Sequence, residues 1–196
     1  MKKIIFALVL LPSLCFAGSV QDACKGVISK KNTVTTCDTA AQKCEGTTNA
    51  AYENFGATAN VYRASKFTAS ATEIVCSVDL YMLKVGTPTF NIKVAVYSHD
   101  AVNDKPNALV GSWSANKAGA DIPAGTWGKF TGMSASITNE TTYWKVLYTD
   151  GNDGSNYGRV YRSDDCGTGR TMYSADGSSW TQIQTGDGWL YRFYKQ

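Results

Sequence analysis

The feature that most constrains the fold is a series of short segments in which apolar and polar residues alternate between clusters of turn residues. The stretch TPTFNIKVAVYSH at positions 87–99 is typical of them. One of its faces carries Ile92, Val94 and Val96, and the other, wetter face carries Asn91, Lys93 and Ala95. A period of two residues predicts a β-strand with one buried face, and full burial of each such apolar side chain contributes roughly 1.5–3 kcal/mol.

Similar segments follow one another from about position 61 to the C-terminus. In the segment that begins at position 73, the expected inner face holds Ile74, Cys76, Val78, Leu80 and Met82. In the segment at 141–150, we expect inward-pointing Trp144, Val146 and Tyr148, with Lys145 pointing out. Short strands at this spacing indicate an all-β protein, an antiparallel β-sandwich rather than a chain of β-α-β units.

Residues 1–17 have the features of a secretory signal peptide: a basic start at Lys2 and Lys3, a short apolar run, and Ala17 before Gly18. The apolar run is too short to span a bilayer, and no later segment is long enough. We therefore expect a secreted protein, periplasmic or extracellular, whose mature chain begins at Gly18.

The charge balance argues against two classes of partner. Without Lys2 and Lys3, the basic residues fall from 19 to 17 against 16 acidic ones. A nucleic-acid-binding protein needs an excess of cations to neutralise phosphates, and attraction to an anionic membrane surface needs the same excess. The sequence therefore predicts neither nucleic acid nor a membrane as the partner.

Five cysteines remain after the signal peptide: Cys24, Cys37, Cys44, Cys76 and Cys166. Exported proteins usually oxidise such residues, and an odd number leaves one unpaired or bonded to another chain. Several connectivities are open. We favour one bridge within the group Cys24, Cys37 and Cys44 and a second from Cys76 to Cys166. Zinc is the weaker alternative, because the chain has no Cys-x-x-Cys and a single histidine.

Positions 18–60 differ in composition from the rest of the mature chain. They are rich in Thr, Ala, Asn and Lys, hold three of the cysteines, and contain only Tyr52 and Phe55 as aromatic residues. We expect them to form a disulfide-tied lead-in with one short helix. Positions 61–196 are then the β-sandwich domain.

Several motifs carry a resemblance to a known group of proteins. They are FTASATEIVCSVDLYMLKVGTPTFNIKVAVYS (67–98), KPNALVGSW (105–113), WGKF (127–130), TTYWKVLY (141–148), YSADGSSW (173–180) and WLYRFYK (189–195). Their order over about 65–196 resembles galactose-binding-domain-like jelly rolls of exported bacterial and phage-associated proteins, including the choice-of-anchor proteins. The resemblance implies a jelly-roll sandwich with a binding or structural role, often related to carbohydrate. The chain departs from that pattern by lacking the C-terminal anchor.

Catalytic motifs are sparse. The only histidine, His99, is expected in a solvated loop and has no nucleophile motif beside it. The adjacent carboxylates Asp164 and Asp165 would point to opposite sides of an extended chain, so they cannot jointly flank a glycosidic bond. We therefore predict a protein that is not an enzyme, with a glycoside-active enzyme as the least favoured alternative.

The loop DGNDGSNYG at 150–158 offers oxygen atoms from Asp150, Asn152 and Asp153 that suit a structural calcium ion. Gly154 stands where a further ligand belongs, so a flexible connection between strands is the favoured interpretation. Apart from this calcium, no cofactor is expected. Further on, Asp176-Gly177 between two strand segments predicts a hairpin.

Residues 143–194 contain eleven aromatic side chains, more than a sandwich core needs. Exposed Tyr and Trp beside Arg are typical of sugar sites, because a ring covers the C–H face of a sugar and polar groups take its hydroxyls. The candidate ligand-binding residues are Tyr157, Arg159, Tyr161, Arg162 and Trp180. The expected function is a non-catalytic glycan-binding module. The alternative is a structural or adhesive extracellular subunit that binds a protein partner.

Overall fold

The computed structural model describes residues 36–46, 51–166 and 169–196. The signal peptide expected at 1–17 lies outside these residues, as does Cys24. The described residues belong to one compact unit, Thr35–Gln196.

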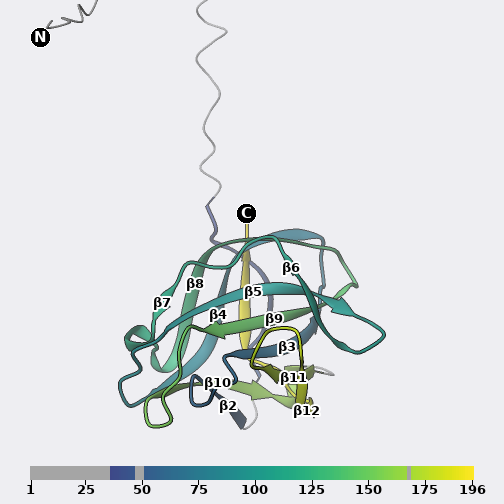
Figure 1. Ribbon diagram of the computed structural model, residues 1–196. Coiled ribbons are helices and arrows are strands. Elements are labelled where there is room, and N and C mark those ends of the chain that lie inside the picture. The colour runs from purple at the N-terminus through teal and green to yellow at the C-terminus, as the bar shows by residue number, and fades with distance from the viewer. Residues whose placement is uncertain (1–35, 47–50, 167–168) are drawn as a thin grey trace, which may run out of the picture. The chain divides into compact units, whose positions relative to one another are not determined.

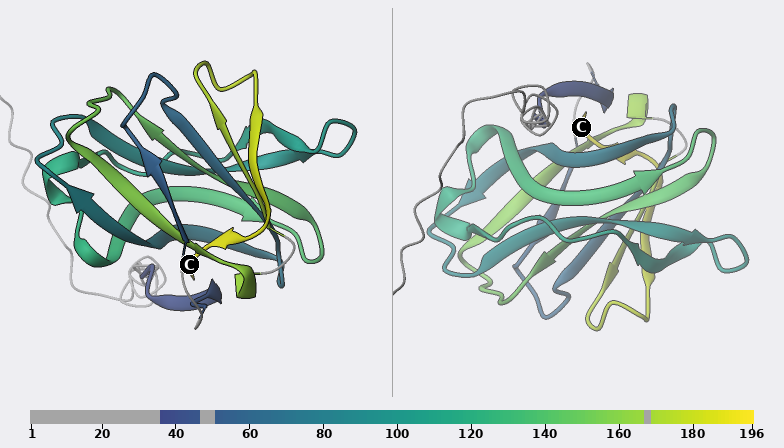
Figure 2. Two further views of the ribbon diagram at one scale, coloured as in Figure 1. Left: turned by 90° about the horizontal axis from the view of Figure 1, so that it is seen from below. Right: turned by 90° about the horizontal axis from the view of Figure 1, so that it is seen from above.

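The chain forms two antiparallel sheets of seven strands each (Figures 1 and 2). In sheet A, neighbouring strands follow the order β1 (Thr39–Cys44), β14 (Tyr191–Lys195), β4 (Glu73–Val85), β10 (Tyr157–Ser163) and β13 (Gly188–Trp189). Two more strands complete it: β8 (Ala124–Ile137) pairs with β4, and β2 (Ala51–Phe55) pairs with β10.

Sheet B has the order β12 (Thr181–Gly186), β11 (Gly169–Ser174), β3 (Tyr62–Thr68), β9 (Thr142–Thr149), β5 (Asn91–Asp100) and β6 (Lys105–Val110), and β7 (Lys117–Ala118) pairs with β5. Two short 3-10 turns, η1 (Gly119–Asp121) and η2 (Asp164–Cys166), are the helical elements among the described residues. From β3 to β5 and from β8 to β11, successive long strands lie in alternating sheets, so the chain wraps around the core. The predicted all-β antiparallel sandwich of jelly-roll type is confirmed.

The main core lies between the sheets and includes most of the apolar residues expected there. Ile92, Val94 and Val96 are at most 1% exposed, as predicted. On β4 the prediction holds for Val78, Leu80 and Met82 but is wrong for Ile74, which is 42% exposed while Val75 is buried. The cause is a β-bulge: β14 pairs with Ser77 and Val75, and the intervening Cys76 has no partner on β14.

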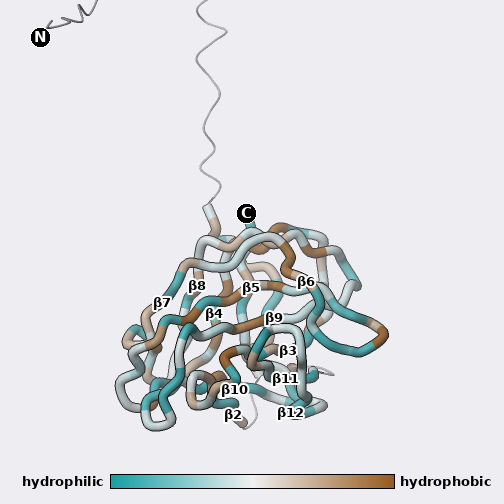
Figure 3. Tube along the Cα trace, in the orientation of Figure 1, coloured by the Kyte–Doolittle hydropathy of each residue, from teal (hydrophilic) through white to brown (hydrophobic). Residues whose placement is uncertain are grey.

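The predicted faces of β9 are wrong, because a second apolar cluster covers the outer face of sheet B. Its buried members are Ala64, Trp144, Val146 and Met172, with Tyr62, Tyr97, Trp113 and Trp180 packed against them. Trp144 and Val146 therefore lie outside the main core, and Ala95, expected on a wet face, is fully buried. Figure 3 shows hydrophobic segments along β5 and β9.

The reversed phase of β9 turns Lys145 toward the space between the sheets. Lys145 is 1% exposed, and its Nζ lies 3.9 Å from the centre of the Tyr191 ring and 4.9 Å from that of Phe67. None of the ion pairs within the described part of the chain includes it. Burial without a counter-ion holds the pKa of Lys145 well below its usual value of 10.5.

The described part of the lead-in forms strands. Within 36–46 and 51–60 the chain contributes β1 and β2 to sheet A, and no helix is present in these residues. None of the helical segments in the described residues is long and apolar enough to cross a membrane.

Two disulfides join the lead-in to the sandwich, Cys37–Cys76 and Cys44–Cys166. The predicted bridge from Cys76 to Cys166 is wrong, and so is the expectation of a bridge within the lead-in for Cys37 and Cys44. Pairing of β1 with β14 explains the difference, because it brings the first cysteine pair to a Cα–Cα distance of 5.8 Å and the second to 5.4 Å. Two such bridges are typical of an oxidising compartment.

We predict that replacing Lys145 with Met stabilises the protein at neutral pH. At pH values below the lowered pKa of Lys145, the free energy of unfolding is smaller by about 1.4 kcal/mol for each unit by which that pKa is lowered. Between the lowered pKa and 10.5, only the unfolded chain holds the proton, so wild-type stability rises with pH there. The free energies of unfolding of wild type and K145M in urea should therefore differ most at pH values below the lowered pKa and converge as the pH approaches 10.5. The exposed Lys129→Met is the control, and a less stable K145M would contradict the prediction.

We predict that the two disulfides differ in their contribution to stability. A disulfide restricts the unfolded chain, and the entropy that it removes grows with the length of the loop it closes. On this basis the free energy of unfolding should fall by about 5 kcal/mol in Cys44→Ala/Cys166→Ala and by about 4 kcal/mol in Cys37→Ala/Cys76→Ala, because the first bridge closes the longer loop. Peptide mapping of the oxidised protein checks the pairing, and denaturant unfolding of the two double variants checks the order. Equal losses would refute the loop-length argument.

Candidate ligand-binding site

The outer face of sheet A carries a row of four aromatic side chains: Tyr52, Tyr161, Tyr81 and Trp127. On β10 and β4 they alternate with core residues, so their rings point away from the interior. Tyr52 lies opposite Tyr161, and Tyr81 lies opposite Trp127. The ring centres are separated by 6.3, 5.2 and 5.4 Å along the row, each pair in an edge-to-face arrangement. We call these four residues the aromatic row.

A guanidinium group covers each end of the aromatic row. The Cζ of Arg159 lies 4.1 Å from the centre of the Tyr52 ring, and the Cζ of Arg192 lies 4.0 Å from that of Trp127. Arg159 also donates to the Tyr157 hydroxyl at 3.2 Å. Exposure is greatest for Tyr52, at 47%, and the other three rings are half-buried. Arg192 Nε in turn donates to Glu45 Oε1 at 2.5 Å, so the row offers ring surface beside guanidinium groups that other side chains hold in position.

The five predicted ligand-binding residues lie in three places. Tyr157, Arg159 and Tyr161 alternate with the inward-facing Gly158 and Val160 on β10 and share the outer face of sheet A. Trp180 packs against Tyr62 on the other sheet, with 6.2 Å between ring centres. The structure thus brings together three of the five.

The fifth residue, Arg162, points between the sheets at the edge formed by β2. Its Nη1 lies 3.0 Å from Asp187 Oδ2, and its Nε lies 4.0 Å from Glu53 Oε1. There it borders an open cavity of about 420 Å³. The cavity, which we call the edge cleft, is lined by Tyr52, Glu53, Asn54, Ala57, Thr58, Asn60, Arg63, Arg162, Tyr173 and Ile183.

Glu53 is the buried acid of the edge cleft. Only 5% of the residue is exposed, and burial raises the pKa of its carboxyl group. Its Oε2 accepts a hydrogen bond of 3.3 Å from Trp189 Nε1–H. Its Oε1 and the neighbouring Arg162 Nε are both buried without a hydrogen-bond partner, as is the hydroxyl of Thr171, which lies close enough to the Glu53 carboxyl to lower its pKa. Such atoms cost about 1–3 kcal/mol each, so the Glu53–Arg162 pair is a point at which a polar ligand would be stabilised.

Arg63 holds the walls of the edge cleft in place. Its Nε donates to the carbonyl of Asn54 at 2.8 Å, and its Nη1 donates to the carbonyl of Asn60 at 3.1 Å. One side chain thus fixes both β2 and the loop that comes after it. Burial lowers the pKa of Arg63.

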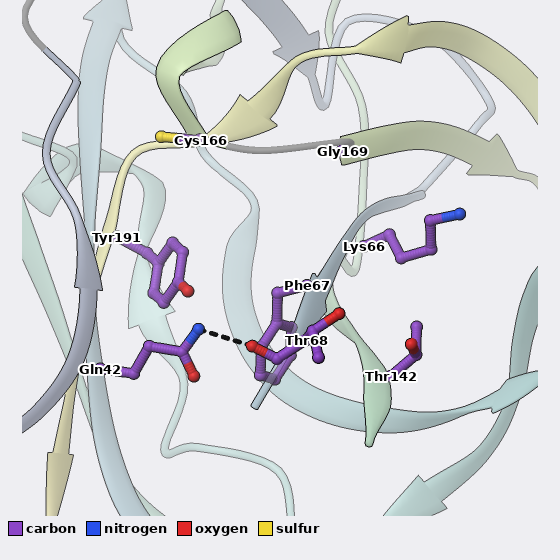
Figure 4. A pocket seen from close by; sticks show the side chains of 8 residues that line it. All are labelled: Gln42, Lys66, Phe67, Thr68, Thr142, Cys166, Gly169 and Tyr191. Carbon is purple, nitrogen blue, oxygen red and sulfur yellow. Dashed lines mark hydrogen bonds between the residues drawn. The ribbon is translucent and has the colours of Figure 1, made fainter. Parts of the chain in front are cut away.

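A second hollow, of about 330 Å³, lies between β1 and β14 on one side and β3 and β9 on the other (Figure 4). Gln42 bridges it by donating to the carbonyl of Thr68 at 2.7 Å and accepting from the backbone N–H of Ser70 at 3.0 Å. Tyr191 forms part of its wall, and burial raises the pKa of that phenol. Cys166 and Gly169 also line it. We assign no ligand to this hollow.

His99 is not in a solvated loop, contrary to the prediction. It lies in β5, its side chain is 19% exposed, and its Nδ1 accepts a hydrogen bond of 3.1 Å from Trp144 Nε1–H. Its Nε2 is 3.8 Å from Asp104 Oδ1, and Asp104 also pairs with Lys66 and Arg170. The Nδ1 lone pair is thus used within the fold, and the group fastens the β5–β6 hairpin to β3 and β11.

The two carboxylates proposed for calcium are already used by N–H donors. Asp150 accepts from the backbone and side-chain amides of Asn91 at 2.6 and 2.8 Å, and Asp153 accepts from Ser155 N–H and Asn156 Nδ2 at 2.9 and 2.8 Å. These bonds lower the pKa of both groups. Asn152 is exposed, and no group of three or more acidic, His or Cys side chains suited to a metal is found among the described residues. This donor set fits a hydrogen-bonded loop better than a cation site.

The hairpin predicted at Asp176-Gly177 is present, since β11 pairs with β12 across it. Asp176 Oδ1 accepts backbone hydrogen bonds of 2.8 Å from both Ser178 and Ser179, and these bonds lower the pKa of Asp176. Gly177 has a φ of +78°, which a residue without Cβ adopts at little cost.

Sequence reasoning missed most of this surface. Alternation puts Tyr81 on the face opposite the core but does not reveal its neighbours across the sheet, and Tyr52 belongs to a lead-in whose strands carry no clear period. Glu53 carries no motif, and only its place on the edge strand β2 brings it to Arg162.

Comparison with known proteins adds no relative: no protein-family model matches the chain, and no curated protein or solved structure is significantly similar to it.

We predict that calcium does not stabilise the protein. At 150–153 a calcium ion would have to share both carboxylates with amide donors that already bond them, and no third acidic side chain among the described residues joins them. Thermal unfolding in EDTA and in millimolar calcium should give the same Tm to within about 1 °C, since a ligand raises Tm only by binding the folded state. A rise of several degrees that Asp150→Asn abolishes would show a calcium site.

Proposed function

We propose that this protein is an exported, non-catalytic module that binds a glycan along the outer face of sheet A. The observation that carries the proposal is the aromatic row, with Arg159 and Arg192 at its ends. Aromatic faces bind the C–H surface of sugar rings, and guanidinium groups donate to hydroxyls.

The construction of the surface supports a binding role. The four rings come from four different strands of one sheet, so their spacing is held by backbone hydrogen bonds rather than by loops. A surface ordered before binding loses little conformational entropy when the ligand arrives. An extended glycan lying across β2, β10, β4 and β8 would contact successive rings.

Two observations favour binding over glycoside hydrolysis. Hydrolysis by the common mechanism needs two carboxyl groups about 5–10 Å apart around one bond. Glu53 is the single carboxylate among the described residues that line the edge cleft. His99, the only histidine, directs Nδ1 at an indole N–H instead of an open site.

A structural or adhesive subunit that uses the same face against a protein partner is the second candidate. Arg and aromatic side chains are enriched where protein interfaces are buried, and the aromatic row combines the two. The two candidates differ in the ligand that should compete: a free oligosaccharide in one, a protein surface in the other.

We predict saturable binding to at least one polysaccharide and a loss of affinity of about tenfold in Tyr161→Ala or Trp127→Ala, equivalent to about 1.4 kcal/mol. The measurement is affinity electrophoresis followed by titration calorimetry on oxidised Gly18–Gln196. Trp180→Ala is the matched control, because it removes an aromatic ring from the opposite sheet.

Circular dichroism and Tm must show that each variant is folded. If a broad polysaccharide panel gave no binding to folded wild type, the glycan proposal would be withdrawn. A loss of binding in Trp180→Ala alone would move the site to sheet B.

A further inference from the structure

The edge cleft continues from the aromatic row, because Tyr52 belongs to both. Its volume, about 420 Å³, falls within the range of about 300–1,000 Å³ of sites for small ligands. Tyr52 and Tyr173 supply ring surface at its walls, and Asn54 and Asn60 are among its polar residues. A ligand that extends along the row toward β2 therefore reaches the cleft.

Two buried atoms of residues that line the cleft lack hydrogen-bond partners of opposite kinds. Glu53 Oε1 lacks a hydrogen-bond donor, and Arg162 Nε–H lacks an acceptor. They lie 4.0 Å apart. A single oxygen atom can stand within hydrogen-bond distance, about 2.7–3.2 Å, of both. A hydroxyl group satisfies both at once, since it donates one hydrogen and accepts through its lone pairs.

Contacts with other residues hold the side chains of Glu53 and Arg162 in position. Asp187 fixes Arg162 through Nη1 at 3.0 Å, and Trp189 Nε1–H fixes the other oxygen of Glu53 at 3.3 Å. Glu53 is only 5% exposed, so the unsatisfied oxygen is not simply turned to bulk solvent. Arg63 ties the neighbouring β2–β3 loop to β2.

We propose that the edge cleft binds one terminal sugar ring of the glycan, with a ring hydroxyl bridging Glu53 Oε1 and Arg162 Nε. This rests on the proposed function and adds a subsite to it: the module recognises a chain end, whereas the aromatic row holds the sugar residues next to that end. Tyr173 and Tyr52 cover the faces of the terminal ring, and Ile183 forms the rim.

The five tryptophans allow the cleft and the row to be observed separately in one spectrum. The indole N–H of Trp189 is hydrogen-bonded to Glu53 and reports on the cleft. The indole of Trp127 reports on the row, and that of Trp144, bonded to His99, reports on the integrity of sheet B. The experiment follows the indole N–H signals of ¹⁵N-labelled, oxidised protein by NMR. The protein is titrated with D-glucose, D-galactose, D-mannose and N-acetyl-D-glucosamine, and then with a polysaccharide that wild type binds in the calorimetric titration.

The expected result is a saturable shift of the Trp189 signal with at least one monosaccharide, weakened at least tenfold in Glu53→Gln. Because Glu53 is buried and this variant can fail to fold, Ile183→Trp is the second variant; it obstructs the rim from the exposed side of β12. Thr181→Trp places the same bulk on β12 outside the cleft lining and should leave the shift unchanged. In each variant, a Trp144 indole signal at its wild-type position confirms that the fold is intact.

Two results would overturn the inference. If polysaccharide shifts Trp127 while no monosaccharide shifts Trp189, or if Ile183→Trp leaves the Trp189 shift intact, the chain-end subsite is refuted and glycan binding along the row stands. If neither indole responds to any saccharide, both proposals are refuted.

Discussion

The architecture of sheet A depends on strand β4, whose 13 residues pair with three other strands. One edge of β4 pairs with β8 over most of its length, and the other edge is shared by β14 at its start and β10 at its end. Where the two meet, Tyr81 N–H donates to Leu190 and Leu190 N–H donates to Tyr161. From this point β10 leaves β4, pairs with β13 and carries β2 at its far edge, and the edge cleft opens beside it.

Three charged side chains point into the space between the two sheets. Replacing buried charged groups by well-packed apolar residues is often neutral or stabilising, yet here Lys145, Glu53 and Arg162 all point between the sheets. Lys145 is enclosed by rings and burdens the fold with an unpaired amine. Glu53 and Arg162, in contrast, line the edge cleft, so a ligand in the cleft would lie beside these two side chains. The two cases differ in position: Lys145 is enclosed by the core, whereas Glu53 and Arg162 line the edge cleft.

Sequence patterns predicted the strands well where one face is clearly more apolar than the other. β5 has the expected alternation of Ile92, Val94 and Val96, and the turn at Gly177 forms the expected hairpin. The prediction was wrong where tertiary contacts covered the second face: on β9, Trp144 and Val146 pack under outer aromatics and Lys145 faces inward. A bulge at Cys76 reversed the phase at the start of β4, and alternation alone cannot reveal an added residue.

By itself, the sequence determined the all-β class, the near-neutral charge and the supply of aromatic and arginine side chains, because these depend on composition and on a local period of two. Tertiary structure alone decided which of those side chains meet. Tyr52 joins Tyr161, Glu53 joins Arg162, and Cys44 joins Cys166 across 122 positions. The physical reason is that cross-strand neighbours are set by register and strand order, and these depend on contacts between residues far apart in the chain.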